Sequence, residues 1–209
     1  QIFASRSFGP VAAIGLGAGA AAMYGRAGEE FTFFEIDPEV EHIASDPACF
    51  SYLADSPAEV KVVIGDARLK LAGTKGLYDL IILDAYGSDS VPVHLLTREA
   101  LAMYAGKLAP QGLIAFHISN LHMDLRPVIA SLAADAGMSV LFQEDADFPE
   151  EEAAAGKAPS RWAVLTRSPG DLAPLLKNGR WEDLAPDPRI RVWTDDYSSI
   201  LPLLDFKLR

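Results

Sequence analysis

The chain has 209 residues, of which 50% are hydrophobic and 22% are charged, and this length suits one domain with a substantial core. The net charge of −11 and the pI near 4.7 argue against a nucleic-acid partner, because phosphate contacts need clustered Lys and Arg. Cys49 is the only cysteine, which excludes a disulfide framework and a cysteine-based zinc site. The sequence contains no apolar run as long as a membrane span and no signal-peptide pattern, so we expect a soluble, cytoplasmic domain.

Strands and helices alternate along the chain. The expected strands are apolar or β-branched runs at 11–16, 31–36, 60–65, 78–86, 112–119, 139–144 and 161–167. The expected helices lie at 19–26, from Pro38 to the mid-forties, and at 67–72, 97–107 and 124–136. This alternation predicts an α/β fold with a doubly wound, mostly parallel seven-stranded sheet, whose ligand lies at the carboxyl ends of the strands. We expect one domain over 1–209, with its core at 11–167 and a C-terminal extension at 168–209.

Glycines and acidic residues follow the first four expected strands. They are Gly15, Gly17 and Gly19 in "VAAIGLGAGA", then Glu35, Asp66 and Asp84. Because the carboxyl ends of parallel strands meet at one edge of a sheet, we expect the acidic side chains to converge on one crevice.

Two cofactor classes fit the glycine turn together with Glu35. The pattern Gly15-x-Gly17-x-x-Ala20, followed by an acid at about the spacing of Glu35, also matches the dinucleotide fingerprint, so a nicotinamide cofactor stays open on these elements. Asp66 favours a sulfonium nucleoside, because a carboxylate after the third strand can accept from the exocyclic amine of an adenosine lying along the sheet edge.

Four stretches together resemble the spermidine synthase family of polyamine aminopropyltransferases: "IGLGAGA", "FFEIDPEVEHIA", "VVIGDARLKLA" and "YDLIILDAYGSDSVPVHLLTREALAMYAGKLAPQGLIAFHISN". The resemblance covers roughly residues 11–135 and is greatest to bacterial spermidine-synthase-like domains, which are often fused to membrane segments. It implies the class I S-adenosylmethionine-dependent methyltransferase fold, a homodimer, and a tether to a membrane region outside this chain.

The resemblance also implies a set of residues that bind the nucleoside. In this family Glu35 would bind the ribose and Ile36 would pack on the adenine, while Asp66 and Ala67 would hold the adenine amino group. The whole implied set is Gly15, Gly17, Ala18, Gly19, Glu35, Ile36, Asp66 and Ala67.

The loop after the fourth expected strand carries the catalytic acids that the resemblance implies. Asp84 matches the aspartate that receives the proton of the attacking amine, and Asp89 takes the part of a second acid in that loop. An unperturbed aspartate is too weak a base to strip an ammonium, so Asp84 either is made more basic by its surroundings or orients an amine that arrives neutral. The implied substrate residues are Tyr86, His94, Asp195 and Tyr197.

Two features depart from the family. Ala18 stands where spermidine synthases carry an aspartate that pairs with the ammonium of decarboxylated S-adenosylmethionine. Removing one member of a buried charge pair costs about 2–5 kcal/mol, so Ala18 leaves room for ordinary S-adenosylmethionine, whose carboxylate the N–H groups of the turn can meet. The N-terminal β-hairpin domain of the family has no counterpart in the nine residues "QIFASRSFG".

We therefore expect a transferase that moves an aminopropyl group from a sulfonium nucleoside to a small-molecule amine. A methyltransferase that uses ordinary S-adenosylmethionine is the alternative enzyme, and a catalytically inactive nucleoside-binding regulatory domain is the alternative outside enzymes. No His, Asp or Glu grouping has metal-ligand spacing, so we expect no metal. His117 lies inside the fifth expected strand, where a histidine is more often a hydrogen-bonded core residue than a base.

Overall fold

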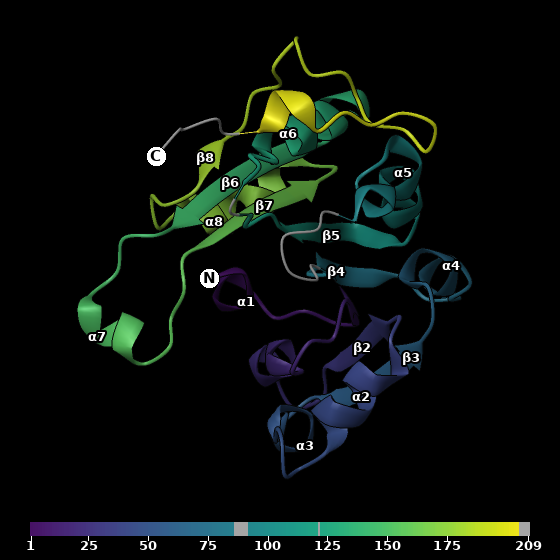
Figure 1. The fold of residues 1–209 in the computed structure, drawn as a ribbon, viewed down its shortest axis with the longest axis vertical. Coiled ribbons are helices and arrows are strands. Elements are labelled where there is room, and N and C mark those ends of the chain that lie inside the picture. Colours follow the sequence, from purple (N-terminus) through teal and green to yellow (C-terminus); the bar gives the residue numbers. More distant parts are fainter. Residues whose placement is uncertain (86–91, 121, 205–209) are drawn as a thin grey trace.

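The computed structural model of the chain describes residues 1–85, 92–120 and 122–204, and its centre is one eight-stranded sheet of order β3-β2-β1-β4-β5-β7-β6-β8 (Figure 1). The strands are β1 Val11–Ile14, β2 Glu30–Glu35, β3 Glu59–Ile64, β4 Tyr78–Leu83, β5 Leu108–His117, β6 Ser139–Asp145, β7 Ser160–Thr166 and β8 Glu182–Asp183. The α-helices are α1 Ile2–Ser5, α2 Pro38–Ser45, α3 Tyr52–Asp55, α4 Ala67–Ala72, α5 Arg98–Gly106, α6 Arg126–Asp135, α7 Glu150–Ala154 and α8 Ala173–Leu176. Short 3-10 helices are η1 Ala20–Tyr24, η2 Val93–Leu95, η3 Pro169–Leu172 and η4 Leu201–Leu203.

The predicted fold class is confirmed by the pairing of the strands. Strands β3, β2, β1, β4 and β5 run parallel to one another, and β7 runs antiparallel to both β5 and β6. The sheet has one strand more than predicted, because Glu182 and Asp183 of the C-terminal extension pair with Phe142 and Leu141 at the edge of β6.

Several elements differ from the sequence prediction in type or extent. The helix predicted at 19–26 is the 3-10 helix η1, which is confined between a left-handed Gly19 and an extended Gly25. Strand β5 starts four residues earlier than predicted and ends at His117, because a register shift beside Tyr78 lets Leu108 join the sheet. Helix α7 lies between the strands expected at 139–144 and 161–167, where no helix is expected from the sequence.

Two hydrophobic clusters cover the two faces of the sheet. Side chains alternate between the faces along each strand, so Ile81 of β4 belongs to the cluster that includes α4, α5 and α6, and Ile82 belongs to the cluster that includes α2 and α8. The C-terminal extension adds Trp193 to the first cluster and Trp181 to the second. With both faces covered, the carboxyl ends of the parallel strands are where this class of fold takes a ligand.

Gly15 lets the loop after β1 lie directly against the end of β4. A Cβ atom on this residue would lie 2.4 Å from the carbonyl oxygen of Asp84, and the φ angle of Gly15 is +93°. Its N–H donates to the carbonyl of Phe34 at 2.9 Å, and the Asp84 N–H donates to the carbonyl of Ile14 at 2.9 Å. The glycine turn is therefore anchored between β2 and β4, with Asp84 beside it.

We expect Gly15→Ala to lower the free energy of unfolding by about 2–4 kcal/mol, because a left-handed residue with a Cβ is strained and the added atom overlaps backbone. Gly17→Ala is the matched control, since its φ is +52° but a Cβ there meets no atom within 4 Å. The control should lose only the conformational strain of about 1–2 kcal/mol. Denaturant unfolding measures both losses, and equal losses would contradict the close approach at Gly15.

Candidate functional site

A cavity of about 340 Å³ lies at the carboxyl ends of the parallel strands. The predicted residues that line it are Gly15, Gly17, Glu35, Ile36, Asp66, Ala67, Asp84 and His94. Apolar side chains complete the wall, among them Phe34, Val40 and Leu95. The structure therefore gathers residues of the glycine turn and all three predicted strand-end acids around a single cavity.

Glu35 is buried at the end of β2, and backbone donors hold both oxygens of its carboxylate. The Leu16 N–H donates to Oε2 at 2.9 Å, and the Asp37 N–H donates to Oε1 at 3.0 Å. Because Leu16 belongs to the glycine turn, this contact ties the loop after β1 to the end of β2. Each carboxylate oxygen can accept a second hydrogen bond, so Glu35 keeps the capacity to receive two hydroxyl donors.

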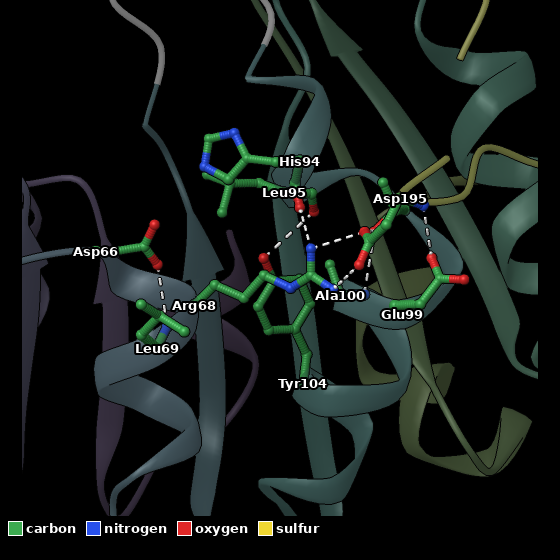
Figure 2. A network of polar contacts seen from close by, with 10 residues as sticks. Asp66, Arg68, Leu69, His94, Leu95, Glu99, Ala100, Tyr104 and Asp195 are labelled. Carbon is green, nitrogen blue, oxygen red and sulfur yellow. Dashed lines mark hydrogen bonds and ion pairs between the residues drawn. The ribbon is translucent and has the colours of Figure 1, made fainter. Parts of the chain in front are cut away.

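Asp66 begins α4 and uses only one carboxylate oxygen to do so. Its Oδ1 accepts from the Leu69 N–H at 3.0 Å, which caps the helix. Its other oxygen has no hydrogen-bond partner among the described residues (Figure 2). Ile36 also lines the cavity and is 69% exposed, which leaves a large apolar side chain available to pack on a flat ring.

Asp84 follows β4, and its side chain contacts His117 at the end of β5, a pairing that the sequence analysis did not predict. Asp84 Oδ1 lies 2.6 Å from Nδ1 of His117, whose Nε2 lies 2.7 Å from Oγ of Ser119. His117 is hydrogen-bonded within β5, as predicted, but it is the last residue of that strand and its side chain is 25% exposed, so it is not part of the buried core. The pairing depends on the register of β4 and β5, in which Leu83 faces Phe116, and no sequence motif signals that register.

A second cavity of about 900 Å³ adjoins the first, and both have Pro92 and His94 in their walls. Its lining includes the predicted substrate residues His94, Asp195 and Tyr197. The ring of Tyr197 is held by the guanidinium of Arg191, whose carbon lies 4.2 Å from the ring centroid. The two cavities are therefore neighbours across η2.

Arg68 joins α4 to the C-terminal extension at the wall of the second cavity (Figure 2). Its guanidinium donates to Asp195 in a bidentate pair, at 2.8 Å to Oδ1 and 2.7 Å to Oδ2, and also donates to the carbonyl of His94 at 3.1 Å. The Thr97 hydroxyl donates to Asp195 Oδ1 at 2.8 Å. Hydrogen bonds from Arg68 and then from Thr97 lower the pKa of the Asp195 carboxyl below its ordinary value. Asp195 is thus a structural ion-pair partner in this structure, and Arg68 is a site residue that the sequence prediction missed.

Two predicted residues line neither cavity, and two others fall outside the described residues. Tyr86 and Asp89 fall in 86–91, outside the described residues. Ala18 and Gly19 belong to the glycine turn but are not among the residues that line the cavity. Gly19 instead packs on Leu53, whose Cδ2 would lie 2.5 Å from an added Cβ.

Within residues 1–85, 92–120 and 122–204, no group of three His, Cys, Asp or Glu side chains is placed to hold a metal ion. The same part of the chain has no helix long and apolar enough to cross a membrane. The described site presents oriented carboxylates, backbone donors and an imidazole around an apolar wall.

The sheet order, the antiparallel β7 and the strand-end cavity define the class: the chain has the Rossmann-like fold of S-adenosylmethionine-dependent methyltransferases. Within that class, its expected resemblance to spermidine synthases is confirmed by sequence and by structure. The chain is 40% identical over 84 residues to a polyamine aminopropyltransferase from Vibrio vulnificus, a match that covers 38% of this chain and 26% of the relative. It is 28% identical over 88 residues to a probable polyamine aminopropyl transferase from Bifidobacterium longum, covering 42% of this chain and 18% of the relative.

Solved structures support the same fold. A probable spermidine synthase from Corynebacterium glutamicum superposes with a TM-score of 0.58 at 18% identity, over 92% of this chain and 74% of that one. A spermidine synthase in complex with the transition-state analogue AdoDATO has a TM-score of 0.55 at 16% identity, over 93% and 64% of the two chains. An O-methyltransferase from Bacillus cereus in complex with SAH has a TM-score of 0.55 at 16% identity, over 78% and 76%. No family model matches the chain.

We expect Asp195→Asn to loosen residues 193–198, because the substituted amide carries no charge to pair with Arg68. Hydrogen exchange at neutral pH should show faster exchange in this segment, and unchanged exchange would contradict its attachment through Arg68.

The lowered pKa of Asp195 also determines how the ion pair depends on pH in the unaltered chain. The pair is complete above the ordinary aspartate pKa of about 3.9 and is lost as the pH falls through the lowered pKa of the folded state. Acid should therefore reproduce the effect of the substitution.

Proposed function

We propose that the chain is the nucleoside-binding and catalytic domain of a spermidine-synthase-like transferase, which moves an aminopropyl group from a sulfonium nucleoside to an amine. The observation that carries the proposal is the single cavity lined by Glu35, Asp66 and Asp84 beside the glycine turn. The named activity of the Vibrio vulnificus relative supports the reaction class.

The cavity near the glycine turn suits an adenosine in size and in the order of its lining groups. A volume of about 340 Å³ lies within the range of small-molecule sites, which combine apolar walls with a few placed polar groups. Glu35 sits where a ribose would lie after β2, and the free oxygen of Asp66 lies one strand further along the edge. The complexes named for the neighbours, with AdoDATO and with SAH, support a ligand of the S-adenosylmethionine type.

For the proposed transfer, the protein must align the amine with the carbon attached to the sulfonium, and it must provide one proton acceptor. The amine nitrogen forms a bond to a carbon attached to the sulfonium, the carbon–sulfur bond breaks, and sulfur keeps the electron pair as a neutral thioether. The surplus proton of the new ammonium passes to the carboxylate of Asp84. The second cavity, which shares His94 with the first, supplies the direction from which the amine approaches.

Methyl transfer from ordinary S-adenosylmethionine is a second candidate, and Ala18 is the observation that favours it. Decarboxylated S-adenosylmethionine presents an ammonium near the glycine turn, and Ala18 offers it no charge. The N–H groups of a glycine turn suit a carboxylate, which only the ordinary form carries.

Calorimetric titration with S-adenosylmethionine, its decarboxylated form, methylthioadenosine and NAD tests the nucleoside site. We expect the adenosine compounds that carry a thioether or sulfonium to bind and NAD to bind far more weakly. Tight binding of NAD alone would contradict the proposed function.

The variant Ala18→Asp should improve binding of the decarboxylated form relative to the ordinary form by about 30-fold or more, the lower bound for restoring a buried charge pair.

We expect Asp84→Asn to reduce turnover by about 10²-fold or more, because the amide cannot accept the amine's proton, while the dissociation constant of the nucleoside stays nearly the same. Asp66→Asn is the matched control at the neighbouring strand end, and it should weaken nucleoside binding and affect turnover less. Steady-state kinetics and calorimetry separate the two effects. Full turnover in Asp84→Asn would contradict the proposed role of Asp84.

A further inference from the structure

We propose that His117 is a positioning residue for Asp84, holding one carboxylate oxygen so that the other faces the reacting amine. The inference rests on the proposed function, since it concerns the proton acceptor of that reaction. It is carried by the contact at 2.6 Å between Asp84 Oδ1 and His117 Nδ1.

The need for such a residue follows from the position of Asp84. Its side chain is 46% exposed and follows β4 without capping a helix, so no backbone donor of the described residues fixes the carboxylate. An aspartate in that setting rotates among staggered rotamers. The imidazole supplies the missing restraint from the neighbouring strand.

Trp162 and Ser119 hold His117 from two further sides. Its ring stacks on the indole of Trp162 from β7, with centroids 4.7 Å apart and planes 16° apart. Its Nε2 meets the Ser119 hydroxyl at 2.7 Å, and that oxygen accepts from the Arg161 N–H at 2.8 Å. The imidazole therefore has a fixed orientation when it meets Asp84.

The hydrogen-bonding chemistry of the pair settles which group donates. An ionised carboxylate only accepts hydrogen bonds, so Nδ1 of His117 must carry the hydrogen that lies between it and Asp84. This occupies Oδ1 and leaves Oδ2, which has no hydrogen-bond partner among the described residues, to receive the proton of the amine. The proton moves from nitrogen to Oδ2, and His117 neither gains nor loses one.

Asp84 contacts His117, which contacts Ser119, in the same arrangement as the acid, histidine and serine of a hydrolytic triad. The surroundings of Ser119 argue against hydrolytic chemistry. Ser119 Oγ accepts from the Arg161 N–H in the ground state, and Ser119 is not among the residues that line the cavity beside Asp84. The group that faces the cavity is the carboxylate, so the chain of contacts ends in an acceptor and not in a nucleophile.

The test is steady-state kinetics of the full chain with decarboxylated S-adenosylmethionine and a diamine, alongside calorimetry with methylthioadenosine. His117→Ala should lower kcat by about 10²-fold with KM and nucleoside affinity nearly unchanged, because a misplaced reacting group costs rate and not binding. His117→Asn should recover most of the rate, because its amide N–H can donate to Asp84 from nearly the position of Nδ1. His42→Ala, at an exposed residue of α2, is the control for loss of a histidine.

Unchanged kcat in His117→Ala would overturn the positioning role, and so would an Asn variant as slow as the Ala variant. An activity-independent arm uses ¹⁵N spectra of the histidine rings: the unaltered chain should show a protonated Nδ1 in His117, and an unprotonated Nδ1 would overturn the pairing. Absence of turnover in the unaltered chain, with this protonated Nδ1 observed, would instead locate the failure in the proposed function.

Discussion

The close approach of Gly15 to Asp84 is the constraint on which the site depends. With no side chain at Gly15, the loop after β1 lies against the backbone that follows β4, and the turn proposed to face a nucleoside's tail lies next to the proposed proton acceptor. A transfer reaction needs the bonds of the donor and the acceptor to be aligned within a fraction of an ångström. The parallel sheet fixes the glycine turn and Asp84 relative to each other through backbone contacts.

The three strand-end acids have one feature in common. Groups of the protein orient each carboxylate and leave it able to accept further hydrogen bonds. Backbone N–H groups hold Glu35, the first turn of α4 holds Asp66, and an imidazole holds Asp84. The three differ in burial, from the buried Glu35 to the half-exposed Asp84. This difference in burial fits the proposed roles. A carboxylate that binds a ribose should keep a fixed position, and a carboxylate that accepts a proton must be reachable by the amine.

The sequence predicted the features that depend on short-range patterns. The apolar run of β4 and the acids after β2, β3 and β4 were readable because strand ends in a parallel sheet must meet at one edge. Contacts between distant segments were not readable: Arg68 reaches Asp195 across 127 positions, and His117 reaches Asp84 only through the register of β4 and β5. The 3-10 form of η1 also escaped prediction, because an alanine-rich segment favours an α-helix until flanking glycines limit its length.

The central claim is that the carbon–sulfur bond to the aminopropyl group breaks in this site while an amine attacks. The most direct measurement is mass spectrometry of the nucleoside released when the protein is incubated with decarboxylated S-adenosylmethionine, ordinary S-adenosylmethionine and a mixture of diamines. The account predicts methylthioadenosine together with an amine heavier by one aminopropyl group. Release of S-adenosylhomocysteine with a methylated product, and no methylthioadenosine, would contradict it.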